Sequence, residues 1–256
     1  MQICKLCDES RELRESHIIP RFLYRYMINI TDNTLTQFSG ALNLWQRSNR
    51  QLTKKLLCSD CEQCLGRNET AFSDIFRLIN SEKNRSIFSY GELGEEENKK
   101  LFEKGFSKKD IDDFFNSNPI YSKLDIIRFF AISYIFRELI NNSYDIPKSE
   151  MDKIKLFLKG EYDLKFMLTV RTHNAEPEFN LFSTVMVMDG LPNWKHYVFY
   201  IPNIQFHVAI NTEETMNEVY KTTIIPSNFF EDEINTLEQL RKHQSGARIA
   251  KNITKK

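Results

Sequence analysis

The sequence predicts an α+β protein with three regions: a cysteine-rich N-terminal module held by zinc, a central helical region, and a C-terminal antiparallel sheet with a final helix. Three observations lead to this prediction. All five cysteines fall in the first quarter of the 256 residues. Apolar residues recur at helical spacing in the middle of the chain, and strand-like segments joined by turn signals fill much of the last part. We place the regions at residues 1–72, 73–160 and 161–256.

The composition is that of a folded soluble protein. Hydrophobic residues make up 41% of the chain and charged residues 27%, which excludes collagen-like and disordered classes. With 35 basic and 35 acidic residues the formal net charge is zero. Any binding of nucleic acid must therefore come from local basic patches, because there is no global positive field.

The most apolar segment, residues 124–140, is interrupted by Arg128, Arg137 and Glu138. We expect it to be a core helix, and we expect no membrane partner. The N-terminus lacks a basic start followed by an apolar segment, which predicts no secretory signal and a cytoplasmic location. In that reducing compartment, clustered cysteines favour metal binding over disulfides.

The cysteines form two Cys-x-x-Cys pairs, Cys4 with Cys7 and Cys58 with Cys61. This spacing lets one tight turn direct two thiolates at a tetrahedral zinc, and the two pairs together complete a four-cysteine structural site. A single pair would equally suit a redox motif or two core cysteines, whereas two pairs favour zinc. Cys64 follows Cys61 by about one helical turn, which favours a bystander thiol over a replacement ligand.

Between the pairs lies a short segment, residues 15–22, that reads as a strand turning sharply at Pro20. It contains His17, the only histidine in the first 172 residues. A lone histidine beside isoleucines is usually a buried core residue. Its position inside a zinc-closed loop favours a functional role instead.

The order Cys-x-x-Cys, Ser-His-Ile-Ile-Pro, Leu-Leu-Cys-x-x-Cys resembles the HNH endonuclease motif with a four-cysteine structural zinc. The resemblance covers about residues 3–72 and implies a ββα-metal fold of the treble-clef type. It also implies that His17 is the general base that activates water for attack on a phosphodiester, chemistry that suits an imidazole near neutral pH. A second, catalytic divalent metal, Mg²⁺ or Mn²⁺, would bridge the scissile phosphate.

The chain departs from the family pattern at three positions. Ser16 replaces the acidic ligand before the base, and Glu15 stands one residue further back on the opposite face of the strand. Glu62 replaces the histidine or asparagine that is expected after the last zinc cysteine. Thr53 stands where an asparagine would precede the second cysteine pair, which leaves Asn49 as a looser candidate for the residue that orients the base.

Glu62 and Glu69 are seven residues apart, so they share one face of a helix that should begin at about Asp60. One of them could offer an oxygen ligand to the catalytic metal. The alternative is that both are solvated carboxylates, with Glu62 favoured by its place in the first helical turn.

Basic residues surround the motif, and three of them, Arg21, Arg25 and Arg67, are our candidates for binding nucleic acid. Arg21 and Arg25 alternate with Phe22, Tyr24 and Tyr26, which could stack on bases while the arginines hold phosphates. The same spacing is typical of an amphipathic helix that buries its aromatic residues. The two interpretations agree if the aromatics face inward and the arginines outward.

Helical spacing recurs in residues 72–79 and 126–139. A further helix is predicted for residues 107–115, where Ser107 precedes Asp110 by three positions as an N-cap. The final helix is predicted for residues 228–243. We expect the basic C-terminal tail after it to be a solvated end.

The predicted strands are residues 164–172, 179–188, 197–201 and 205–211, and the turns between them favour antiparallel pairing. His196 and His207 lie in or beside these strands without a cysteine or acidic partner at ligand spacing. We therefore interpret both as structural or surface residues.

The leading hypothesis is a metal-dependent HNH-type endonuclease that cleaves nucleic acid, with DNA favoured over RNA. Neutral charge and large accessory regions suggest homo-oligomerisation or a regulatory protein partner, as in an effector of a bacterial or phage conflict system. The alternative is a zinc-stabilised module for binding nucleic acid or protein that has lost catalysis, which the serine before His17 favours.

Overall fold

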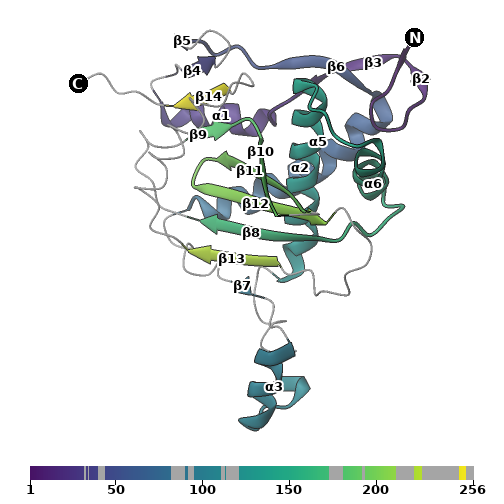
Figure 1. Ribbon diagram of the computed structural model, residues 1–256. Coiled ribbons are helices and arrows are strands. Elements are labelled where there is room, and N and C mark those ends of the chain that lie inside the picture. The colour runs from purple at the N-terminus through teal and green to yellow at the C-terminus, as the bar shows by residue number, and fades with distance from the viewer. Residues whose placement is uncertain are drawn as a thin grey trace.

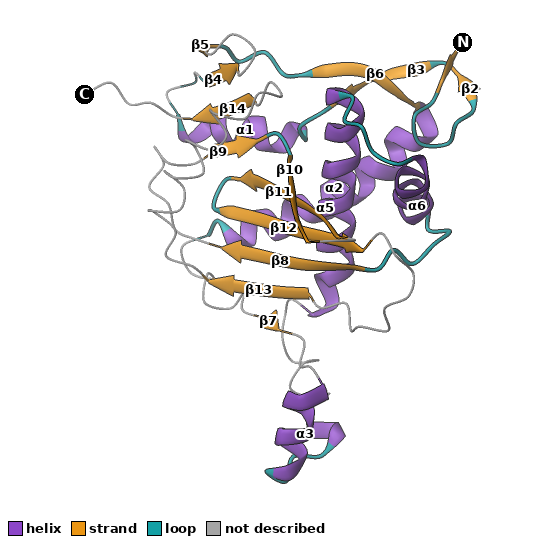
Figure 2. Ribbon diagram, in the orientation of Figure 1, coloured by secondary structure: helices purple, strands orange, loops and turns teal. Residues whose placement is uncertain are grey.

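The computed structural model of the chain describes residues 1–31, 33, 35–39, 44–81, 90–91, 95–110, 113, 121–172, 181–191, 194–211, 222–226 and 248–251. Helices and sheets are both present in this part, so the predicted α+β class is confirmed (Figure 1). Figure 2 shows long strands of the C-terminal sheet beside long helices. None of the described helices is both long enough and apolar enough to cross a membrane.

In the described part of the N-terminal region there are six short strands and two helices. These are β1 (Gln2–Ile3), β2 (Ser10–Arg11), β3 (Leu13–His17), α1 (Arg21–Ile30), β4 (Thr36–Ser39), β5 (Leu44–Arg47), β6 (Thr53–Cys58) and α2 (Ser59–Ile79). Strands β3 and β6 pair antiparallel, with Leu13 opposite Cys58 and His17 opposite Thr53. Helix α2 begins directly after Cys58. One strand pair thus has a cysteine ligand candidate at one end and His17 at the other.

The described elements of the central region include the helix that packs on α2. They are the short strand β7 (Tyr90–Gly91), α3 (Glu95–Glu103), the 3₁₀ turn η2 (Tyr121–Lys123), α5 (Leu124–Asn142) and α6 (Lys148–Lys159). Helix α5 packs against α2, and α6 packs against α5. Phe72 of α2 stacks on Phe130 of α5 with ring centroids 3.7 Å apart. The predicted boundary at residue 72 falls inside α2, and buried side chains of all three regions belong to one hydrophobic cluster.

Helix α5 is the core helix expected from its composition, since most of its residues are buried. The predicted cap at Ser107 is also present. The Asp110 amide donates to the Ser107 hydroxyl at 3.2 Å, and the Asp110 carboxylate accepts from the Ser107 amide at 2.8 Å. Residues 108–110 are helical, whereas residues 111–112 and 114–115 of the predicted helix lie outside the described residues.

The C-terminal region supplies β8 (Phe166–Thr172), β9 (Leu181–Ser183), β10 (Met186–Leu191), β11 (Trp194–Ile201), β12 (Ile204–Asn211), β13 (Thr222–Pro226) and β14 (Arg248–Lys251). The six-stranded sheet has the order β10-β11-β12-β8-β13-β7. Its neighbours are antiparallel, as predicted, except that β13 runs parallel to β8. The predicted helix at residues 228–243 lies outside the described residues.

Two predictions for this region are wrong in detail. The strand expected at residues 179–188 is two strands in different sheets, because β9 joins a four-stranded sheet of order β5-β4-β14-β9. Ser183 pairs with Ile249 of β14 in that sheet, and its carbonyl also accepts a hydrogen bond from the Tyr134 hydroxyl at 2.6 Å. The tail is not wholly a solvated end, since β14 pairs with both β4 and β9.

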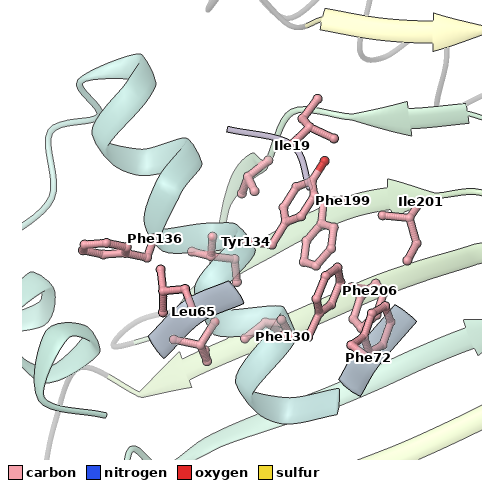
Figure 3. Close-up of a cluster of buried hydrophobic side chains, with 14 of the residues drawn as sticks. Ile19, Leu65, Phe72, Phe130, Tyr134, Phe136, Phe199, Ile201 and Phe206 are labelled. Carbon is pink, nitrogen blue, oxygen red and sulfur yellow. The ribbon is translucent and has the colours of Figure 1, made fainter. Parts of the chain in front are cut away.

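The core lies between the large sheet and helices α2 and α5 (Figure 3). Aromatic rings fill it, with Tyr134 stacked on Phe199 at 4.3 Å and Phe199 stacked on Phe206 at 4.6 Å between centroids. Phe206 also contacts Phe130 at 5.8 Å. This packing fixes α5 against the sheet. Because α5 packs against α2, it also fixes the position of α2.

Candidate metal centre and the His17 cluster

Four cysteines that are far apart in the sequence come together at one end of the β3–β6 pair. Cys4 and Cys7 lie on the turn between β1 and β2, Cys58 ends β6, and Cys61 is in the first turn of α2. Their sulfur atoms all lie within 4.8 Å of one another, and Cys7 Sγ is 4.0 Å from Cys58 Sγ. A tetrahedral zinc with Zn–S bonds of about 2.3 Å needs sulfurs about 3.8 Å apart. The cluster is therefore compatible with a structural metal site such as zinc.

Backbone hydrogen bonds shape this cluster. The Cys58 amide donates to Cys4 Sγ at 3.3 Å, and the Lys5 amide donates to the Leu56 carbonyl at 3.0 Å. Burial raises the pKa of the Cys4 thiol, but hydrogen bonds from backbone amides outweigh it and bring this pKa down to about 7. Burial and the adjacent thiols raise the pKa of Cys61. A cation bound among the four sulfurs would offset the effect of burial on their pKa values, because it stabilises all four as thiolates.

Cys64 does not belong to the four-sulfur group. Its thiol donates instead to the carbonyl of Leu158 in α6, at 3.9 Å. The arrangement follows from helix geometry, because Cys64 lies on α2 almost one turn after Cys61 and faces the neighbouring helix.

His17 ends β3 and is half-buried. Its Nδ1 atom is buried and has no hydrogen-bond partner in the part of the chain that the structure describes. Burial lowers the His17 pKa below 6.5, the positive charges of Arg21 and Arg137 lower it further, and Glu62 and Glu15 oppose them. The imidazole is therefore neutral at neutral pH, which is the state that a general base requires.

Glu62 and Glu69 share one face of α2, as predicted, and this face contacts the guanidinium of Arg137. Arg137 of α5 forms ion pairs with both, its Nη2 lying 3.6 Å from Glu62 Oε2 and its Nη1 contacting Glu69 Oε1. The Arg137 side chain is only 2% exposed. Burial lowers its pKa, and the Glu62 carboxylate opposes that shift. The two carboxylates are thus neither free nor simply solvated.

These residues do not fit a ready-made site for a catalytic metal. Among the described residues, the four cysteines are the only group of three or more histidine, cysteine or acidic side chains whose ligand atoms converge. Arg137 takes both Glu69 and one oxygen of Glu62. The second oxygen, Glu62 Oε1, is buried and has no hydrogen-bond partner within the described ranges. The prediction that Glu62 or Glu69 holds Mg²⁺ or Mn²⁺ gains no support from this arrangement.

Asn49 does not orient His17 in this structure. Its Oδ1 accepts from the Leu35 amide at 2.9 Å, and its Nδ2 donates to the Asn33 carbonyl at 2.6 Å. Both ends of the amide therefore brace the segment that follows α1. Of the two residues before the histidine, Glu15 is exposed and Ser16 is fully buried.

The candidate nucleic-acid residues Arg21, Arg25 and Arg67 are all exposed. The aromatic residues between the arginines of α1 face inward: Tyr24 is buried, and Phe22 packs edge-on against Phe76 at 5.3 Å. The aromatics are therefore core residues and are not placed to stack on bases. Arg21 lies close enough to His17 to affect its pKa, so a phosphate held by Arg21 would be near the imidazole.

His196 and His207 contact each other on neighbouring strands β11 and β12, with His207 Nδ1 3.2 Å from His196 Nε2. Burial lowers the pKa of both rings, and that of His207 falls to about 4 with contributions from His196 and Arg171. The pair is therefore neutral at neutral pH and lies in the C-terminal sheet.

Sequence reasoning missed Arg137 as a site residue. The available signal was a charged side chain in an otherwise apolar helix, since an arginine is almost never fully buried without a partner. Comparison of the chain with protein-family models, with curated proteins and with solved structures gave no match.

Proposed function

We propose that this chain is an HNH-type endonuclease that hydrolyses phosphodiester bonds in nucleic acid, with DNA as the favoured substrate. The observation that carries the proposal is the position of His17. It ends the strand that pairs with β6, ahead of α2, and the four-cysteine cluster lies at the other end of the same strand pair. This ββα order is the one that the resemblance to the HNH motif implies.

The role of each residue follows from its environment. Neutral His17 takes a proton from a water molecule as the water oxygen attacks the phosphorus, and the 3′ oxygen leaves with a proton from solvent. Arg21 and Arg25 are exposed on the first turns of α1, directly after the His17 segment, and would hold phosphates beside the base. Arg67 would add a phosphate contact from α2.

Zinc in the four-cysteine cluster has a structural role in this proposal. Four thiolates leave no open coordination position, which is typical of structural and not catalytic zinc. Binding closes the long loop between Cys7 and Cys58 and keeps β3 and β6 in register. It thereby positions His17 without touching the substrate.

The proposed reaction assigns no step to Mg²⁺ or Mn²⁺, although the resemblance to the HNH motif implies one of them. The carboxylates expected to ligate that metal form ion pairs with Arg137. The assay decides whether an added metal is required. Purified zinc-loaded chain is incubated with plasmid DNA and with structured RNA, with and without Mg²⁺ or Mn²⁺. Wild type is compared with His17→Ala and with Glu12→Ala, an exposed neighbour that serves as the matched control.

We expect the His17→Ala variant to lose about 100- to 10,000-fold in cleavage rate, the usual contribution of a general base. The Glu12→Ala variant should cleave as the wild type does. Equal cleavage by wild type and His17→Ala would contradict the proposal.

A second function is favoured by one observation. Arg137 forms ion pairs with both Glu62 and Glu69 from within the protein, as expected if the module has lost its metal and its catalysis. It would then be a zinc-stabilised module that binds nucleic acid or protein. Binding of DNA by wild type and His17→Ala with equal affinity, and no cleavage by either, would favour this alternative.

A further inference from the structure

We propose that Glu62 is a positioning residue for His17: its Oε1 accepts a hydrogen bond from His17 Nδ1–H and leaves Nε2 as the basic nitrogen. The inference rests on the proposed function and names the residue that orients its base. That place was expected for Asn49, whose amide is used elsewhere.

The first argument is that one buried atom of His17 and one of Glu62 lack a hydrogen-bond partner among the described residues. His17 Nδ1 and Glu62 Oε1 are both buried without a hydrogen bond to any described residue. Leaving a buried polar group unpaired is unfavourable, so native structures pair nearly all of them. A protonated ring nitrogen and a carboxylate oxygen are complementary, and a contact between them satisfies both atoms at once.

The second argument is proximity. The carboxylate of Glu62 acts on the His17 imidazole from the first turn of α2, and so does the guanidinium of Arg137 from α5. Hydrogen bonds of catalytic residues are often long before substrate binds and tighten only in the complex.

The third argument concerns the way in which Arg137 holds the Glu62 carboxylate. Arg137 contacts Glu62 through Oε2 only, so the carboxylate is held at one oxygen and presents the other. Glu69 binds the same guanidinium and fixes it from the next turns of the helix. The ion pairs of buried Arg137 with Glu69 and Glu62 thus connect α5 to the proposed contact with His17.

The proton inventory balances. Before reaction, Nδ1 carries the imidazole proton and Nε2 has a free lone pair. The attacking water gives its proton to Nε2, and a hydrogen bond to Glu62 stabilises the imidazolium that forms. The proton on Nε2 then passes to solvent and restores the neutral base.

The test is the tautomer of His17, read by long-range ¹H–¹⁵N NMR on the zinc-loaded full chain with ¹⁵N-labelled histidine at pH 8. The His17 signals are assigned by their loss in His17→Ala. Glu62→Gln removes the carboxylate but keeps its size, and Glu69→Gln is the matched control, because it removes the other carboxylate from the same arginine. Zinc content confirms that each variant keeps its module.

We expect the proton on Nδ1 in the wild type and in Glu69→Gln, and a shift of the proton toward Nε2 in Glu62→Gln. Cleavage by Glu62→Gln should fall about 10- to 100-fold in kcat with KM unchanged, as for other residues that fix the tautomer of a functional histidine. A proton on Nε2 in the wild type would overturn the proposal even if a variant failed to fold.

Two further outcomes also overturn it. Selective broadening of His17 signals by added Mn²⁺, without nucleic acid, would show that the two unpaired atoms share a metal ion. A wild type that has the Nδ1–H tautomer but cleaves neither DNA nor RNA would refute the proposed function, and would leave the Glu62 contact as a structural one.

Discussion

Replacing Arg137 with methionine tests whether the buried ion pairs hold α5 to α2. The arginine is 2% exposed, and its partners Glu69 and Glu62 are 16% and 23% exposed. Removing one member of a buried ion pair costs about 3–5 kcal/mol, because the remaining charges stay desolvated. The two carboxylates retain some contact with solvent, so we expect the lower end, a loss of about 3 kcal/mol in the free energy of unfolding.

The measurement is urea denaturation of the zinc-loaded chain, followed by circular dichroism. Lys155→Met is the control, since the Lys155 ion pair with Asp8 at 2.7 Å also joins a central helix to the N-terminal module. Asp8 is 60% exposed, and an ion pair of this kind is worth about 0–1 kcal/mol. A variant with Arg137→Met, Glu62→Gln and Glu69→Gln together should regain most of the lost stability. A loss below about 1 kcal/mol in Arg137→Met alone would refute the reasoning.

Three other predictions concern the metal centre and two buried groups. Cys58→Ala should lose zinc and the folded N-terminal module, whereas Cys64→Ala should keep both, as measured by metal content and circular dichroism. Folding lowers the pKa of His207 from 6.5 to about 4, so between these values the unfolded chain binds a proton and the folded chain does not. The contribution of His207 to the free energy of unfolding is therefore complete above pH 6.5 and falls by about 2 kcal/mol between pH 7 and pH 5. A pH series of urea midpoints should be flatter in this window for His207→Gln than for wild type, and parallel curves would contradict the assignment. Burial raises the pKa of Glu150, whose carboxylate accepts a hydrogen bond from the Tyr197 hydroxyl at 2.5 Å. Keeping Glu150 charged in the folded chain therefore lowers the free energy of unfolding at neutral pH. This loss disappears toward pH 4, where the carboxyl is protonated. Glu150→Gln should therefore raise the unfolding free energy at pH 7, and a loss of stability at pH 7 would contradict this.

Local sequence signals predicted the elements that depend on local physics. Helix α5 follows from its apolar residues, and the strands β8, β11 and β12 follow from alternation and turn residues. The meeting of the four cysteines was also predictable, because two Cys-x-x-Cys pairs favour one tetrahedral site.

Pairings between distant segments were not predictable in this way. Strand β14 adds to a sheet whose other members come from the N-terminal region and from β9. Strand β9 is separated from β10 because it pairs with β14, which lies far along the chain. Neither partner carries a local signal for the other, so pattern alone gave one continuous strand.

The same limit applies to the site, and there it has a consequence for function. Glu69 and Arg137 are 68 residues apart, and the arginine lies well outside residues 3–72, where the chain resembles the HNH motif. A charged residue in an apolar helix requires a buried partner, but the sequence does not say which carboxylate that partner is. Because the charges of Arg137 and Glu62 both affect the His17 pKa, the environment of the proposed base depends on α5 and on the aromatic core that fixes it. If the proposed function holds, the N-terminal motif depends on the central helices, because Arg137 of α5 forms ion pairs with Glu62 and Glu69 of α2.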